Sequence, residues 1–191
     1  MPRASVGESE EAMSVQIAKH WFTVRDYERM GELGILPAGE RYELMRGEII
    51  EMSPIGKRHA ACVNRLGRIL NDQVDKSVIV STQNPIQLDD YSEPQPDVAL
   101  LRFCDDFYSE SLPTPADVLL VVEVSDTTLD YDRQFKLADY ARAGIPEVLI
   151  CNLPDEQLEY FAQPAEGAYH FTRNLDTRRA SGIRERAGRS V

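Results

Sequence analysis

The segment DVLLVVEVS at residues 117–125 constrains the fold of this chain more than any other part of the sequence. Its apolar residues occupy both alternating positions, which is typical of a strand that is covered on both faces. The same segment contains Glu123. A carboxylate in such a strand loses its water, and this costs several kcal/mol unless a positive or protic group compensates it. The sequence therefore predicts a central covered strand and a partner for Glu123.

Length and composition indicate one globular domain. The chain has 191 residues, of which 42% are hydrophobic, enough to bury a sizeable core. No apolar run approaches the roughly 20 residues that span a bilayer, and the first residues lack the apolar core of a signal peptide. The three cysteines are few and far apart, so we expect no disulfide framework and a cytoplasmic protein. The net charge of -11 argues against a broad, non-specific grip on nucleic acid.

The pattern of elements predicts an α/β fold. We expect a flexible arm at residues 1–20, one domain at 21–172 and an Arg-rich disordered tail at 173–191. Helices are predicted within 22–34, with Thr23 as N-cap, 56–76 and 131–144, and strands within 41–54, 77–88, 95–102, 117–125, 146–153, 156–163 and 168–173. A turn at Arg46 and Gly47 divides the first of these strand segments, and the last two pair as a terminal hairpin. The covered strand, the helix after it and the next strand favour a right-handed crossover in a mixed sheet. The predicted architecture is a central mixed β-sheet flanked by helices on both sides.

Several common chemistries have no support in the sequence. No Gly-rich phosphate loop follows a strand, and no serine lies in a nucleophile elbow. His20, His59 and His170 lack the spacing of zinc ligands. We interpret His59, at the start of the long helix, as a solvated or capping histidine and not as a catalytic base.

Two carboxylates remain as candidates for catalysis. Asp97 opens one short apolar strand, and Glu123 lies near the end of the next. If these strands are neighbours, the two anions converge and repel each other. Mg²⁺ resolves this conflict, because one or two carboxylates, waters and phosphate oxygens complete its coordination, and the ion activates water for attack at phosphorus. We expect both carboxylates on one side of the sheet, within about 6 Å of each other.

A lysine on the following helix completes the candidate set. Ser125 faces the same side of the strand as Glu123, at a position where a lysine would lie beside the metal. Lys136, on the helix that follows, would instead reach back and hold the attacking water or the phosphate. Its alternative role is an exposed ion pair with Asp132, four residues earlier.

Several blocks of sequence occur in the order found in one family, namely RYELMRGEIIEMSPIGKRHA, EPQPDVALL and VLLVVEVSDTTLDYDRQFKLADYARAGIPEVLICNL. Over about residues 20–165 the chain resembles the Uma-type family of restriction endonucleases, within the PD-(D/E)xK nuclease superfamily. The resemblance implies a restriction-endonuclease-like core and Mg²⁺-dependent phosphodiester hydrolysis, with Mn²⁺ as a substitute. It assigns Asp97 and Glu123 to the metal and Lys136 to a lysine moved from strand to helix. It places Glu43 at an upstream acidic position that helps to bind metal or water.

The expected function is therefore that of a homodimeric endonuclease that cuts DNA with a metal-activated water. Two alternatives stay open. One is a binding or assembly module that keeps the nuclease fold without turnover, and the other is a metal-dependent hydrolase of a small phosphoester. A basic cleft above Glu123 would favour nucleic acid, and a closed neutral pocket would favour the small ester.

Overall fold

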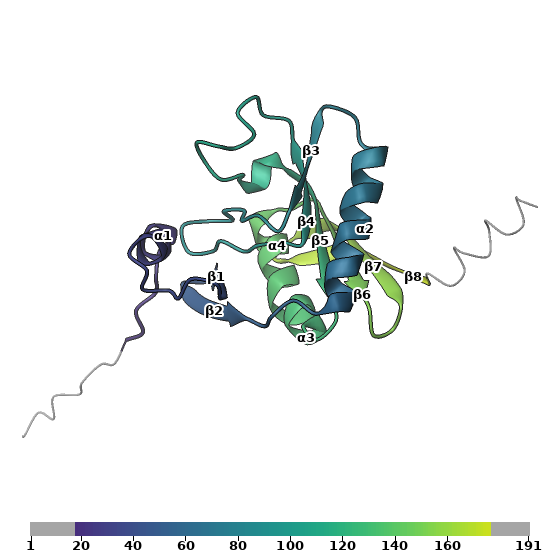
Figure 1. Ribbon diagram of the computed structural model, residues 1–191. Helices are drawn as coiled ribbons and strands as arrows, with labels where there is room; N and C mark the ends of the chain where they lie inside the picture. Colours follow the sequence, from purple (N-terminus) through teal and green to yellow (C-terminus); the bar gives the residue numbers. More distant parts are fainter. Residues whose placement is uncertain (1–17, 177–191) are drawn as a thin grey trace, which may run out of the picture.

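A mixed six-stranded sheet forms the centre of the computed structural model, which describes residues 18–176 (Figure 1). The strands lie in the sheet in chain order, and within this part of the chain only β5 and β6 are parallel neighbours. The six strands are β3 (Val78–Thr82), β4 (Val98–Arg102), β5 (Val118–Ser125), β6 (Glu147–Asn152), β7 (Gln157–Ala165) and β8 (Ala168–Asp176). The predicted α/β class with a mixed central sheet is confirmed.

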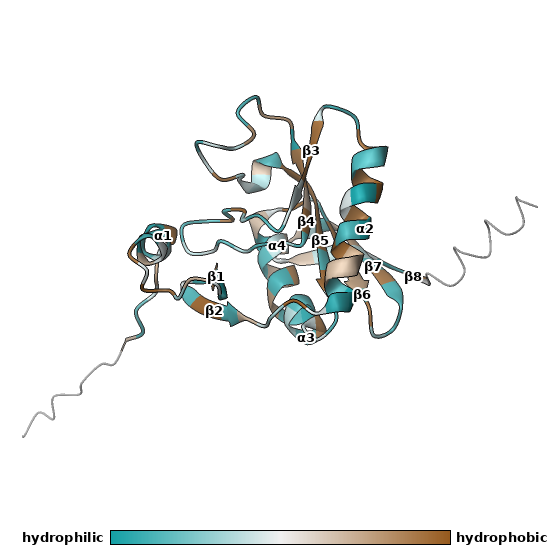
Figure 2. Ribbon diagram, in the orientation of Figure 1, coloured by the Kyte–Doolittle hydropathy of each residue, from teal (hydrophilic) through white to brown (hydrophobic). Residues whose placement is uncertain are grey.

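Helices cover both faces of this sheet, so β5 is buried on both sides. Figure 1 shows α2 (Lys57–Gln73) and α4 (Leu137–Ala143) on different sides of the strands. Val122 packs in a cluster with Val63 of α2, whereas its neighbour Val121 packs in a cluster with Tyr140 of α4. Both valines are 0% exposed. Figure 2 shows the hydrophobic colour along the central strands. The apolar residues of β5 alternate between two separate cores, as the sequence predicted.

The crossover from β5 to β6 is less regular than the predicted single helix. It begins as α3 (Leu129–Tyr131), continues as a π-helical turn, η2 (Asp132–Lys136), and ends as α4. Gly144 ends it with a φ of 79°, a conformation that costs glycine little. Single π-helical turns are frequent at functional sites. The turn η2 contains Lys136, which is only 2% exposed.

The N-terminal part of the described chain packs a hairpin beside the sheet. Helix α1 (Val24–Glu32) is capped by Thr23, as predicted, and β1 (Arg41–Met45) pairs with β2 (Glu48–Met52) in a separate two-stranded sheet. Arg46 and Gly47 form the predicted turn, with φ values of 52° and 74°, as a type I′ turn requires. The Glu93 N–H donates to the Leu44 carbonyl oxygen at 2.7 Å and ties the hairpin to the loop before β4.

The predicted terminal hairpin is formed by β7 and β8. Strand β8 continues to Asp176, so the domain boundary predicted after residue 172 falls inside a strand. The predicted flexible arm, up to residue 17, and the predicted tail, from residue 177, lie outside the described residues. No helix within residues 18–176 has the length and apolar character to cross a membrane.

Candidate active site

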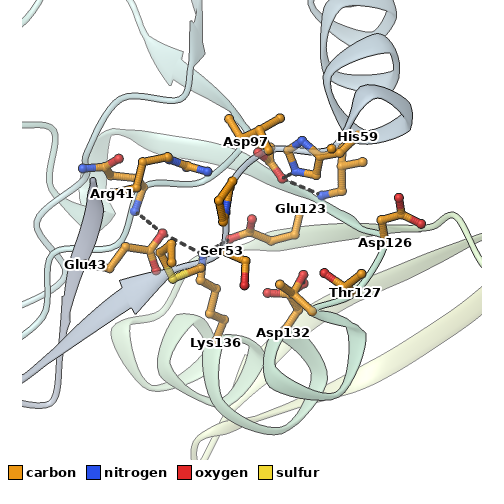
Figure 3. A pocket seen from close by; sticks show the side chains of 17 residues that line it. Arg41, Glu43, Ser53, His59, Asp97, Glu123, Asp126, Thr127, Asp132 and Lys136 are labelled. Atoms are coloured by element: carbon orange, nitrogen blue, oxygen red, sulfur yellow. Dashed lines mark hydrogen bonds and ion pairs between the residues drawn. The ribbon is translucent and has the colours of Figure 1, made fainter. Parts of the chain in front are cut away.

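A cavity of about 120 Å³ lies at the end of β5 where the hairpin, the start of α2 and the crossover helix meet (Figure 3). All four predicted site residues line it: Glu43, Asp97, Glu123 and Lys136. They come from four different elements or their ends, and all are buried. The structure therefore brings together residues that lie as far apart in sequence as positions 43 and 136.

The register of the sheet explains why Asp97 and Glu123 meet. Val98 of β4 is opposite Val122 of β5 in an antiparallel pair, so Asp97 and Glu123 form the next position along the same two strands. Residues directly opposite in such a pair lie on the same face, with Cβ atoms about 5 Å apart. Both side chains line the one cavity, so they do not face opposite sides of the sheet. The separation of their carboxylates, about 6 Å, stays a prediction.

Asp97 is held by a network that keeps it ionised. Its Oδ2 lies 2.9 Å from Nε2 of His59 and accepts the backbone N–H of Val124 at 2.9 Å. The Gln83 side-chain amide donates to Oδ1 at 3.3 Å. Burial tends to raise the pKa of Asp97, but the hydrogen bonds from His59 and Val124 outweigh it and lower the pKa below the ordinary value. Asp97 is thus an oriented, negatively charged ligand candidate.

The interpretation of His59 as a solvated or capping histidine is wrong. Its side chain is only 15% exposed and contacts Asp97. A signal was present, because Cys62, Val63 and Leu66 follow His59 at spacings of three, four and seven on one helix face. Cys62, Val63 and Leu66 belong to the core beneath α2, so His59 points toward the protein interior.

The hydrogen bond with Asp97 predicts at which pH His59 loses its charge relative to a free histidine. The hydrogen bond with Asp97 raises the pKa of His59 above 6.5, more than burial lowers it. The stability gained from this pair is therefore present below the unfolded pKa and is lost as the pH rises through the folded pKa. In a proton NMR titration we expect the His59 ring to titrate with a midpoint above pH 6.5. The His59→Asn variant identifies the signal of this ring, because it removes that signal from the spectrum. Asp97→Asn should move that midpoint down, and an unchanged midpoint would contradict the pairing.

Glu123 has two hydrogen-bond partners, and these compensate the carboxylate that the sequence places in a buried strand. Lys136 Nζ donates to Glu123 Oε1 at 3.3 Å, and the Tyr140 hydroxyl donates to the same oxygen at 2.6 Å. Lys136 Nζ also donates to Glu43 Oε1 at 3.0 Å (Figure 3). The ammonium therefore bridges two buried carboxylates, one from the hairpin and one from the central strand.

The alternative interpretation of Lys136 as an exposed partner of Asp132 is wrong. Lys136 is buried, and Asp132 accepts other donors, the hydroxyl groups of Ser125 and Thr128, both at 2.7 Å. Ser125, the residue at the position where a strand lysine would lie, thus anchors the start of the crossover helix. This bond fixes the turn that carries Lys136 next to the end of β5.

The pKa values at this cluster are set by burial and by the ammonium. Burial raises the pKa of Glu123 to about 8, although the charge of Lys136 opposes the shift. Burial alone would lower the pKa of Lys136, but Glu123 and Glu43 outweigh it and raise the pKa above its ordinary value. Burial also raises the pKa of Tyr140, followed by the charge of Glu123. Lys136 is therefore a fixed positive charge in the wall of the cavity.

The donors around the cavity fit a hard divalent cation. They are carboxylate oxygens, the ligands that Mg²⁺ prefers. Glu43 Oε2 is buried and has no hydrogen-bond partner among the described residues, so one acceptor in the wall is unsatisfied. Within residues 18–176 no group of three or more His, Cys, Asp or Glu side chains is arranged to hold a metal ion. A site of two carboxylates with water and phosphate needs fewer protein ligands, and Asp97 and Glu123 would supply them.

Comparison with known protein families gives a match that includes the residues of the cavity. A model of the Uma2 family, described as "Putative restriction endonuclease", matches residues 24–183. The chain belongs to the Uma2 family. A solved structure, described as a "putative nuclease belonging to DUF820" from Anabaena variabilis, superimposes with a TM-score of 0.57 at 13% identity, covering 77% of this chain and 83% of that one. No curated protein sequence matches. The Uma2 match contains all four predicted site residues, and the restriction-endonuclease-like fold is confirmed.

Proposed function

We propose that this member of the Uma2 family is a Mg²⁺-dependent endonuclease that hydrolyses phosphodiester bonds of DNA. The observation that carries the proposal is the convergence of Asp97, Glu123 and Lys136 on one cavity, with the ammonium reaching in from the crossover helix. Asp97 and Glu123 would hold the metal, which when bound activates water and offsets charge at phosphorus. The description of the family supports the substrate class.

The residues of the chain supply orientation and fixed charge. Lys136 keeps its proton and is placed to donate to the attacking water or to a phosphate oxygen as negative charge develops. Tyr140 holds the Glu123 carboxylate by its hydroxyl, and His59 holds Asp97. These contacts orient both ligand candidates for metal and substrate.

The charge of the cavity supports a requirement for a cation. Of the residues that line it, Arg41, His59 and Lys136 are basic, whereas Glu43, Asp97, Glu123, Asp126 and Asp132 are acidic. It is neither the basic cleft that would favour nucleic acid nor the neutral pocket that would favour a small ester. A phosphodiester enters such a cavity only with a metal ion to offset the repulsion. We further propose a homodimer, since one cavity cuts one strand and a duplex has two.

Nicking of supercoiled plasmid tests this function. We expect cleavage in Mg²⁺ or Mn²⁺, none in a chelator, and a loss of at least about 100-fold in Asp97→Asn, the scale of losing one charged catalytic contact. Asp105→Asn, in an exposed loop outside the cavity, is the matched control and should cleave like the wild type. Hydrolysis of a small phosphodiester without DNA cleavage would support the small-ester alternative. DNA binding without hydrolysis of any substrate would support the binding module.

A further inference from the structure

A second cavity, of about 650 Å³, lies between the hairpin turn and α4, outside the candidate active site. Trp21, Arg46, Tyr91, Asp139 and Arg142 line it. The volume is typical of sites that bind small molecules or single groups of larger ligands. None of these residues contacts Asp97, Glu123 or Lys136 through a hydrogen bond or ion pair that the structure shows, so the active site does not explain them.

Gly47 packs against the backbone of the two aromatic residues that line this cavity, Trp21 and Tyr91. The Phe22 N–H donates to the Gly47 carbonyl oxygen at 2.9 Å, and the Gly47 N–H donates to the Tyr91 carbonyl oxygen at 2.7 Å. A Cβ atom at Gly47 would lie 2.7 Å from the Trp21 Cβ, so only glycine permits this approach. Trp21 and Tyr91 are each 47% exposed. They are large aromatic side chains that are held in place by their backbone and remain half exposed, with the Lys19 ammonium 5.4 Å from the centroid of the Trp21 ring.

The polar side of the cavity is a buried aspartate with two arginines. Asp139 is 6% exposed, and its Oδ1 accepts Arg46 Nε at 2.8 Å and also pairs with Arg142. Its Oδ2 is buried without a hydrogen-bond partner in the described part of the chain. Each guanidinium has five N–H donors, and both side chains are about half exposed. The cavity thus offers several donors and one unsatisfied acceptor.

The charges define the kind of ligand. Arg46 and Arg142 are balanced by Asp89 and Asp139, so the cavity has no excess of positive charge that would favour an isolated phosphate. A flat, neutral heterocycle with both donors and acceptors fits it better. Such a ring stacks on aromatic side chains, accepts hydrogen bonds from the guanidinium groups and donates to the carboxylates of the lining, Asp89 and Asp139. Nucleobases have this chemistry.

The position relative to the active site agrees with this ligand. Arg46 follows Glu43 by three residues of the hairpin, a span of about 10 Å in an extended chain. Asp139 follows Lys136 by three residues of the helix, a rise of about 4.5 Å. The two cavities therefore share the hairpin and the crossover helix, and residues of one lie within about 10 Å of residues of the other along these elements.

We propose that this cavity binds an unpaired nucleobase of the strand whose phosphodiester occupies the active site. The proposal rests on the proposed nuclease function and adds a single-stranded segment to its substrate. The base stacks against Trp21 and Tyr91, and Arg142 and Asp139 contact its polar edge.

The only tryptophan of the chain is Trp21, which gives a direct readout. We would titrate the protein with a short fluorescein-labelled single-stranded oligodeoxynucleotide, with Ca²⁺ as the only divalent ion. Anisotropy reports total binding, and an unlabelled copy of the oligonucleotide reports stacking by quenching of Trp21 emission. We expect saturable quenching, with Tyr91→Ala weakening binding at least about 5-fold, the lower end for loss of one base stack. Phe171→Ala, an exposed aromatic on β8, is the matched control and should change neither signal.

The outcomes separate this proposal from the nuclease proposal. Binding by anisotropy without quenching, and with no effect of Tyr91→Ala, overturns the base site and leaves the nuclease untouched. Quenching that depends on Tyr91, in a protein that cleaves no DNA in Mg²⁺ or Mn²⁺, supports the base site and overturns the catalytic proposal. Equal quenching by a blunt duplex overturns the preference for an unpaired base, and no binding of any DNA overturns both proposals.

Discussion

Lys136→Met is expected to reduce DNA cleavage by about 100-fold or more and to lower the free energy of unfolding of the metal-free protein by about 3 kcal/mol. The rate falls because the only buried ammonium of the described cavity is lost. The stability falls because Glu43 and Glu123 lose the charge that bridges them. The loss stays near the lower end for a broken buried pair, since burial raises the pKa of Glu123 to about 8 even beside Lys136, and this carboxyl group is mostly protonated at neutral pH.

Three measurements check this expectation. Rates come from plasmid nicking in Mn²⁺, and stabilities come from urea unfolding in a chelator. Mn²⁺ should then raise the Tm of Lys136→Met more than that of the wild type, because a metal held by Asp97 and Glu123 would offset part of the missing positive charge beside Glu123. Lys136→Arg should not restore the rate, since a planar guanidinium does not fit a compact ammonium site. Lys76→Met, at an exposed position, is the control. Equal rates in all variants would remove Lys136 from the mechanism.

Glu123→Gln is expected to abolish cleavage and to weaken Mn²⁺ binding sharply, while it changes how stability depends on pH. Burial raises the pKa of Glu123 from 4.5 to about 8, so the folded protein binds a proton more readily than the unfolded chain does. The contribution of Glu123 to the free energy of unfolding is fully present below pH 4.5 and is lost as the pH rises through about 8. The neutral amide of glutamine has no such loss. The variant should therefore be as stable as the wild type at pH 5 and more stable at pH 9, both without metal.

Urea unfolding at the two pH values measures this difference, and calorimetric titration measures the metal. Glu110→Gln, in an exposed loop, is the matched control and should follow the wild type in both experiments. Unchanged Mn²⁺ affinity in Glu123→Gln would place the metal on other carboxylates. A large loss of stability at pH 5 would mean that the main role of Glu123 is structural, through its hydrogen bonds with Tyr140 and Lys136, and not to bind the metal.

The central strand and its neighbours were predictable because their signals are local. Apolar residues at both sets of alternating positions in 117–125 indicate a strand that is covered on both faces. A carboxylate among them indicates a partner that compensates its charge. Asp97 and Glu123 meet because consecutive strands pair, which is the common arrangement. The helix cap at Thr23 and the turn at Arg46 and Gly47 depend only on neighbouring residues.

The rest of the site depends on contacts that no local pattern reports. Lys136 and Glu43 are 93 positions apart, and only the resemblance to a family drew attention to Glu43. Tyr140 lies on the apolar face of its helix, and periodicity alone describes it as core, although its hydroxyl holds Glu123. The π-helical turn at Asp132–Lys136 has no sequence signal that we recognise, and the burial of Lys136 within it separates a catalytic candidate from an exposed ion pair.

The hairpin of β1 and β2 has a consequence for how the protein would fail on heating. It supplies Glu43 to one cavity and Arg46 to the other, yet it pairs with no strand of the six-stranded sheet in the described chain. A two-stranded hairpin has little stability of its own, so it depends on its tertiary contacts, among them those with Lys136 and Asp139. Detachment of the hairpin is a local opening that needs less free energy than melting of the sheet. We therefore expect both cavities to be lost on heating before the six-stranded sheet melts.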